Sequence, residues 1–208
     1  MPSLIPEDLT RAGTHALVIG ISAYPHIDGG SDPTSDGYAS NLGQLTSAAR
    51  SASEFAEWLL NDYHNPDVPL ASLRVLLSPS DGEQIHPDIL DKLPADHDAD
   101  RAAVEKEFAG FRNACASHAE NVAFVYIAGH GVQKTKHGAI VLLSDFARDG
   151  HLNKLTGAVD MASLHAGMNH PDTAQTQFWF IDACRHKPAI ARHFENLTGA
   201  LVIDEPNG

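Results

Sequence analysis

Four short, largely apolar segments are the feature that most restricts how this chain can fold. The segments are residues 16–21, 73–77, 122–127 and 177–181. The first is continuous and rich in β-branched residues, which is typical of a strand that is buried on both faces of a sheet. Two stretches between them, residues 46–60 and 99–118, place apolar side chains at helical spacing. The alternation predicts an α/β fold with a mostly parallel central sheet and helices on both faces.

Weaker signals predict four smaller elements and the limits of the domain. The elements are a short strand at 139–143, helices at 161–168 and 188–195, and a last strand at 200–203. The chain has 208 residues, of which 43% are hydrophobic, enough for one domain with a sizeable core. We expect residues 1–13 to form a polar N-terminal extension and residues 14–208 to form the domain.

Charge and composition disfavour several classes of protein. The formal net charge is −13, whereas a nucleic-acid binder would carry a basic surface. No apolar run approaches the roughly 20 residues of a membrane span, and no basic start precedes an apolar core as in a signal peptide. The two cysteines, Cys115 and Cys184, do not suggest a disulfide framework. We therefore expect a cytoplasmic protein that binds neither nucleic acid nor membrane.

A histidine and a cysteine each follow a predicted core strand. Carboxyl ends of parallel strands meet at one edge of a sheet, where sites form, so His130 and Cys184 are candidates for a catalytic pair. An imidazole activates a thiol by taking its proton and can later protonate a leaving amine. The backbone N–H groups of Gly131 and Cys184 would then stabilise the oxyanion. Taken singly, such a histidine is usually a loop residue and such a cysteine a core residue, as we expect for Cys115.

The flanks of both residues resemble known motifs. The segment Tyr-Ile-Ala-Gly-His-Gly at 126–131 resembles the histidine motif of caspases, metacaspases and their bacterial relatives, and Phe-Ile-Asp-Ala-Cys-Arg at 180–185 resembles their cysteine motif. Cys184 follows His130 by 54 residues, close to the roughly 50 typical of caspases. The continuation Arg-His-Lys-Pro at 185–188 is most similar to bacterial caspase-like proteins. The resemblance implies a three-layer caspase-like fold and a cysteine endopeptidase acting on proteins, in regulated cell death or defence signalling.

The resemblance also implies a substrate preference. In this fold the residue two before the nucleophile, here Asp182, lines the pocket for the side chain before the cut. A carboxylate there attracts a cation, so we expect cleavage after Arg or Lys; the alternative is that Asp182 caps a following helix. Metacaspases have a second aspartate in an Asn-Asp-Ala step, where this chain has Ser47. Asp36, in the preceding loop, is a candidate substitute.

The chain resembles the large-subunit portion of a caspase-like unit more than the whole. Three explanations remain open: a truncated sequence, an enzyme cut into two pieces, or a minimal family member. The first two imply a companion small-subunit-like chain or a regulatory protein as partner. Two other functions also remain open, a non-catalytic regulatory or scaffolding module and an esterase or transferase that uses the same dyad.

The sequence gives little support for a metal or cofactor. Residues 96–100 are acidic, and oxygen ligands suit Ca²⁺, which activates some metacaspases. The EF-hand pattern is absent, which favours a solvated acidic loop. Histidine and cysteine spacings typical of zinc sites and the phosphate-binding loop motif are absent too. We expect no cofactor, with Ca²⁺ activation as the alternative.

Overall fold

The computed structural model describes residues 3–35, 42–133, 138–150, 153, 155–184 and 200–201. Its helices and strands are β1 (Thr14–Ile21), α1 (Ala48–Asn61), β2 (Leu70–Ser78), α2 (Pro87–Leu90), α3 (Arg101–Cys115), β3 (Val122–Gly129), β4 (Gly131–Gln133), β5 (Ala139–Leu142), β6 (Ala158–Asp160), α4 (Met161–Met168) and β7 (Thr176–Ala183). No helix within these ranges is both long and apolar enough to cross a membrane.

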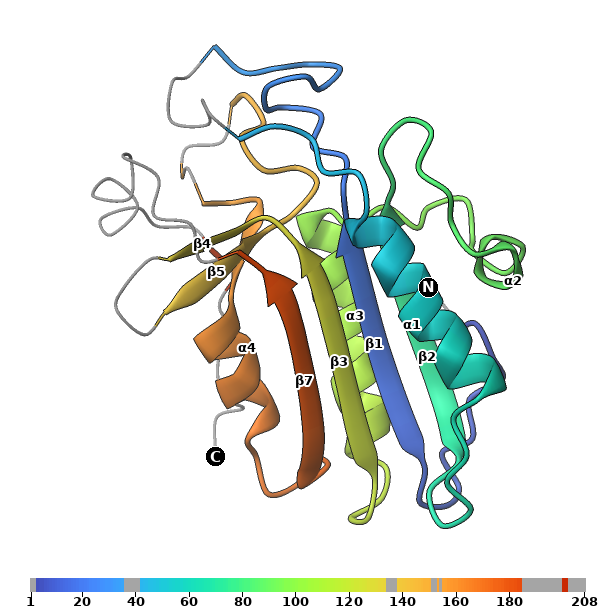
Figure 1. Ribbon diagram of the computed structural model, residues 1–208. Helices are drawn as coiled ribbons and strands as arrows, with labels where there is room; N and C mark the ends of the chain where they lie inside the picture. Colours follow the sequence, from blue (N-terminus) through green and yellow to red (C-terminus); the bar gives the residue numbers. More distant parts are fainter. Residues whose placement is uncertain are drawn as a thin grey trace.

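The main sheet is parallel, with the strand order β2-β1-β3-β7. Helix α1 covers one face and α3 the other (Figure 1), which confirms the predicted α/β architecture with helices on both sides. All four strands point the same way, so their carboxyl ends share one edge. The four predicted segments form these four strands. Strand β1 is buried along its whole length, whereas β7, at the edge of the sheet, is largely exposed.

The two helical layers have different cores. On the α3 side, large rings of Phe108 and Phe111 and the thiol of Cys115 fill the space and are at most 2% exposed. On the α1 side the buried helix residues are mostly alanines and a serine. A Cβ at Gly20 would lie 2.5 Å from the Ala52 Cβ, so small residues on both elements allow the helix to approach the sheet closely.

The beginning of α1 is capped by a residue distant in sequence. Ser47 occupies the N-cap position but makes no side-chain capping hydrogen bond. The Glu83 carboxylate takes that place: its Oε1 accepts from the Arg50 N–H at 2.9 Å and from the Ser22 hydroxyl at 3.0 Å. Its Oε2 accepts from the Ser80 N–H at 3.0 Å. One carboxylate thus links the ends of β1 and β2 to the first turn of α1.

A small antiparallel sheet, with the order β4-β5-β6, continues from the end of β3. The predicted strand at 139–143 is β5 and the predicted helix at 161–168 is α4. The strands β4 and β6 and the single-turn helix α2 were not predicted, because three or four residues are too few to establish a period. The predicted helix at 188–195 lies outside the described residues, as does most of the strand at 200–203; Leu201 forms a parallel bridge with Val159.

The N-terminal extension lies along the outer edge of β2. The Leu4 N–H donates to the Leu73 carbonyl at 2.7 Å, and the Asp8 N–H donates to the Ala71 carbonyl at 3.2 Å. Glu7 forms an ion pair with Arg74, whose guanidinium also pairs with the buried Glu107 at 2.8 Å. The segment therefore covers backbone groups that an edge strand would otherwise expose.

Candidate active site

His130 lies between β3 and β4, at the carboxyl edge of the main sheet, and is half-buried. Its ring Nε2 lies 2.7 Å from the carbonyl oxygen of Gly43, in the segment that leads into α1. A carbonyl can only accept, so Nε2 must carry the hydrogen and Nδ1 keeps its lone pair when the ring is neutral. Burial lowers the pKa of His130, and the hydrogen bond to Gly43 opposes that shift. The neutral, proton-accepting form is therefore favoured at neutral pH.

Tyr24 supports this histidine, and the sequence analysis did not identify it. Its hydroxyl accepts a hydrogen bond from the His130 N–H at 2.8 Å and donates to the Leu142 carbonyl at 3.4 Å. The two rings are tilted, with centroids 4.9 Å apart. Burial raises the pKa of Tyr24, so the phenol stays neutral. Nothing in the sequence marks this contact, because the two residues are 106 positions apart.

Cys184 follows β7 directly and is an exposed, free thiol. Strands β3 and β7 are paired so that Gly129 lies opposite Ala183, and the next residues along the two strands are His130 and Cys184. The backbone of Gly131 is also in close contact with this end of β7. A Cβ at Gly131 would come within 2.3 Å of the Cys184 carbonyl oxygen, so only glycine allows this approach. The structure therefore brings the two sequence motifs together.

The pairing of β4 with β5 orients the predicted oxyanion donor. The Leu142 N–H donates to the His130 carbonyl at 2.9 Å, and Gly131 is the next residue, opposite Val141. Hydrogen-bonded and non-hydrogen-bonded pairs alternate in an antiparallel ladder. The Gly131–Val141 pair is thus non-hydrogen-bonded, and the Gly131 N–H points away from β5. A backbone N–H that points away from the neighbouring strand can donate to an oxyanion instead of to that strand.

Asp182 is exposed and lies opposite Ala128 on the neighbouring strand β3. Side chains two residues apart share a face of a strand, so Asp182 lies on the same face as Phe180. That face is the one covered by α1, because the Phe180 ring lies 5.4 Å from the Phe55 ring of that helix. Burial raises the pKa of the nearby Tyr126, and the negative charges of Asp182 and Glu54 raise it further. Two carboxylates therefore act on one phenol beside the carboxyl edge.

Of the other two predicted substrate-binding residues, Ser47 and Asp36, the structure describes only Ser47. Ser47 is exposed at the N-cap of α1, at the same edge of the sheet and two helical turns before Phe55. Ser47 and Asp182 thus flank the same α1-covered face, although no hydrogen bond joins these two described residues. Asp36 lies outside the described residues.

Two further expectations concern residues away from this edge. Cys115 is fully buried in the core, and burial raises the pKa of its thiol, in keeping with the structural role expected for it. In the acidic segment 96–100, Asp98 accepts a hydrogen bond from the Ser78 hydroxyl, and the Asp100 carboxylate caps α3 by accepting from the Ala103 N–H at 2.7 Å. Asp98 thus links the segment before α3 to the end of β2, and Asp100 stabilises the first turn of α3. The described residues contain no group of three or more potential metal ligands.

The fold and this edge are those of a known protein class. The family model of the caspase domain matches residues 14–205, so the chain belongs to the caspase-domain family, a family of cysteine peptidases. The family assignment agrees with the three-layer architecture and with the resemblance seen in the two motifs. Comparisons with curated proteins and with solved structures gave no match.

Proposed function

We propose that the protein is a cysteine endopeptidase in which Cys184 is the nucleophile and His130 is the general base and acid. The observation that carries the proposal is the register of β3 and β7, which puts the ends of the two motifs next to each other. The Gly43 carbonyl adds to it by holding the proton on Nε2, which leaves Nδ1 free to accept the thiol proton.

The reaction follows from these positions. Nδ1 of His130 takes the proton of the Cys184 thiol, and the thiolate attacks the carbonyl carbon of the scissile peptide bond. The N–H groups of Gly131 and Cys184 donate to the oxyanion. His130 then gives the proton to the leaving amine, the C–N bond breaks and a thioester remains. A water molecule, deprotonated by His130, hydrolyses the thioester and restores the thiol.

The surroundings of Asp182 support a preference for Arg or Lys before the cut. Its carboxylate is exposed on the α1-covered face, and Glu54 adds negative charge at the same phenol of Tyr126. The exposed ring of Phe180 offers a face on which a guanidinium can stack. Glu54, which also lies 3.7 Å from Arg50, supplies a second carboxylate on the helix that begins after Ser47, the position where metacaspases have a second acid.

The test compares three reporter peptides that differ only in the residue before the cut: Arg, Lys or Asp. The chain of residues 1–208 should cleave the Arg and Lys peptides, and Cys184→Ala and His130→Ala should each abolish cleavage. His64→Ala is the matched control, because His64 is exposed in the connection between α1 and β2. Preference for the Asp peptide would refute the specificity, and equal cleavage by Cys184→Ala would refute the mechanism.

A chemical label separates an inactive chain from a wrong assignment. A chloromethyl ketone bearing Arg should modify Cys184 and leave the buried Cys115 unmodified, as read by mass spectrometry. Labelling of Cys184 without peptide cleavage would indicate that a companion chain is needed to complete the substrate site. Absence of both labelling and cleavage would favour the non-catalytic, scaffolding alternative.

A companion small-subunit-like chain is the partner that we propose for this enzyme. Among the described residues, β7 is hydrogen-bonded to a neighbour on one side only. It carries three exposed large apolar side chains, Phe178, Phe180 and Ile181, each about 40% exposed. Such an edge is suited to receive a further strand together with apolar cover for these rings.

A further inference from the structure

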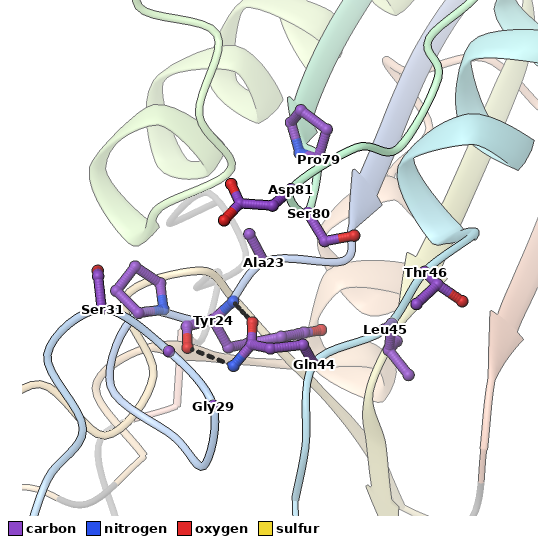
Figure 2. Close-up of a pocket in the computed structure, with 12 residues that line it drawn as sticks. Ala23, Tyr24, Gly29, Ser31, Gln44, Leu45, Thr46, Pro79, Ser80 and Asp81 are labelled. Atoms are coloured by element: carbon purple, nitrogen blue, oxygen red, sulfur yellow. Dashed lines mark hydrogen bonds between the residues drawn. The ribbon is translucent and has the colours of Figure 1, made fainter.

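A second recess lies at the carboxyl edge of the sheet, at the ends of β1 and β2. It is a pocket of about 310 Å³ between the loop after β1, the segment that enters α1 and the turn after β2 (Figure 2). Its lining comes from residues 23–25, 29–31, 44–46 and 79–81. The volume is that of a small ligand site and is sufficient for one long side chain.

The walls of this pocket are held in place by hydrogen bonds. The Gln44 side chain accepts from the Tyr24 N–H at 2.7 Å and donates to the Tyr24 carbonyl at 2.9 Å, and it also donates to the Asp28 carbonyl at 3.1 Å. The Leu45 N–H donates to the Ser22 carbonyl at 2.9 Å. A pocket whose wall is fixed in this way is preformed, so binding a side chain there costs little ordering of the protein.

The pocket lies on the leaving-group side of the proposed catalytic pair. Along the carboxyl edge the strand order is β7, β3, β1, β2, so Cys184 comes first, His130 second and the pocket last. The contact between His130 and Gly43, the neighbour of Gln44, joins the pocket wall to the histidine. Because His130 must protonate the leaving amine, the substrate residues after the cut extend past His130 toward β1 and β2.

The distance from Cys184 to the pocket sets which substrate residue it receives. Neighbouring strands lie about 4.8 Å apart, so two to three strand spacings correspond to about 10–14 Å. An extended peptide advances about 3.3 Å per residue, which brings the third or fourth residue after the cut to the pocket.

The chemistry of the lining selects a basic side chain. Asp81 supplies the only carboxylate among the residues that line the pocket, and it is exposed. Figure 2 shows it above Ala23, on the opposite side of the pocket from Gln44. No hydrogen bond or ion pair joins the Asp81 side chain to another described residue. The nearby Glu83 carboxylate, in contrast, accepts four hydrogen bonds. An unpaired carboxylate at the mouth of a preformed recess favours a cation.

From these observations we propose that this pocket is a substrate subsite for a Lys or Arg side chain at the third or fourth position after the scissile bond, with Asp81 as the specificity-determining residue. The inference rests on the proposed peptidase function. It adds a second point of recognition, separate from the one at Asp182 before the cut.

The first test measures kcat/KM for quenched fluorogenic peptides with Arg before the cut and Lys, Ala or Glu at the third or fourth position after it. We expect the Lys peptide to exceed the Glu peptide by about two- to fivefold, as an exposed charge pair would give. Asp81→Asn should abolish this ratio, while Asp96→Asn, a change at an exposed aspartate of the α2–α3 connection, should retain it. An unchanged ratio in Asp81→Asn, or no preference in the wild type, would overturn the proposal.

The second test does not depend on catalysis. In Cys184→Ala, a tetrapeptide amide with Lys at its third position is titrated while backbone amide shifts are followed by NMR. Shifts at Gly29, Ser31 and Ser80 that disappear in the Asp81→Asn background, and that a matched Glu peptide does not cause, support the subsite even if no peptide is cleaved. Cleavage of the Arg peptides without such shifts would refute the subsite and leave the peptidase function standing.

Discussion

His130 is oriented by residues that lie outside its own motif. Its ring donates to Gly43, its N–H donates to Tyr24 and its carbonyl accepts from Leu142. Each bond fixes a different atom of the residue, so together they determine both the position and the tautomer of the imidazole. The position of this proposed catalytic residue therefore depends on the loop after β1 as much as on β3.

Tyr24→Phe tests this dependence at a single atom. The change removes the acceptor of the His130 N–H, and a partly buried donor left without a partner costs about 1–3 kcal/mol. We expect a loss of stability in that range in urea unfolding, together with a reduced kcat. Tyr63→Phe is the control, because the Tyr63 hydroxyl is hydrogen-bonded to Thr14 at the opposite end of β1; it should lower stability without changing kcat. Equal kcat values in wild type and Tyr24→Phe would refute the positioning role.

The buried side chain of His15 should make the stability of the folded protein depend on pH. It is fully buried beside Ser72, and burial lowers its pKa from 6.5 to about 4. The unfolded chain thus binds this proton more readily than the folded chain, so the contribution of His15 is complete above pH 6.5 and is lost as the pH falls toward 4. Between pH 7 and pH 5 the wild type should lose about 2 kcal/mol from this residue.

The measurement is urea unfolding at both pH values for the wild type and His15→Asn. The variant is expected to be less stable at pH 7 but to lose about 2 kcal/mol less between the two pH values. Equal losses in the two proteins would mean that His15 is protonated equally in the folded and unfolded states.

At the scale of elements, hydrogen bonds connect the beginning of α1 both to the end of β1 and to His130. Glu83 caps the helix and fixes Ser22, whose carbonyl accepts from Leu45 in the segment that also carries Gly43. The cap, the helix and the contact to His130 thus form one continuous set of hydrogen bonds.

Glu83→Ala should therefore affect stability and catalysis together. Loss of an N-terminal cap costs about 0.5–2 kcal/mol, and we expect that loss in thermal or urea unfolding. The less restrained Gly43 carbonyl supports the His130 ring less well, so the pKa of His130, read by NMR titration, should fall further. Glu57→Gln, a change on the same helix near its other end, should leave that pKa unchanged; a Glu83 variant with an unchanged His130 pKa would contradict the connection.

At the scale of the whole molecule, the sequence was sufficient to predict the main sheet and the proximity of the two motifs. The four strands of the main sheet could be predicted because each is a short, largely apolar segment, and the proximity of His130 and Cys184 follows from parallel strands ending at one edge. The roles of Tyr24, Gly43 and Glu83 could not be predicted. Their contacts to Arg50, Ser22 and His130 span 33 to 106 residues and depend on how loops close over the sheet, which leaves no periodic signal in the chain.

The N-terminal segment contributes to the stability of the whole domain through Glu7. Its ion pair with Arg74 lies next to the buried Glu107, so Glu7→Gln removes one of the carboxylates that are paired with a nearly buried guanidinium. Hydrogen bonds to charged groups contribute about 1.5–3 kcal/mol, and we expect a stability loss near the lower end, since Glu7 is partly exposed. Glu105→Gln, at an exposed pair with Arg101, should cost less than 1 kcal/mol in the same assay. Equal losses would contradict a special role for Glu7.

The two edges of the main sheet differ in whether their backbone groups are already covered. Residues 3–8 close the β2 side, whereas the β7 side presents unpaired backbone and exposed rings among the described residues. Among the described residues, only the β7 side leaves an edge to which a strand from another molecule can be added, and such a strand would lie directly beside Cys184. Its addition would both enlarge the sheet and change the surroundings of the proposed nucleophile.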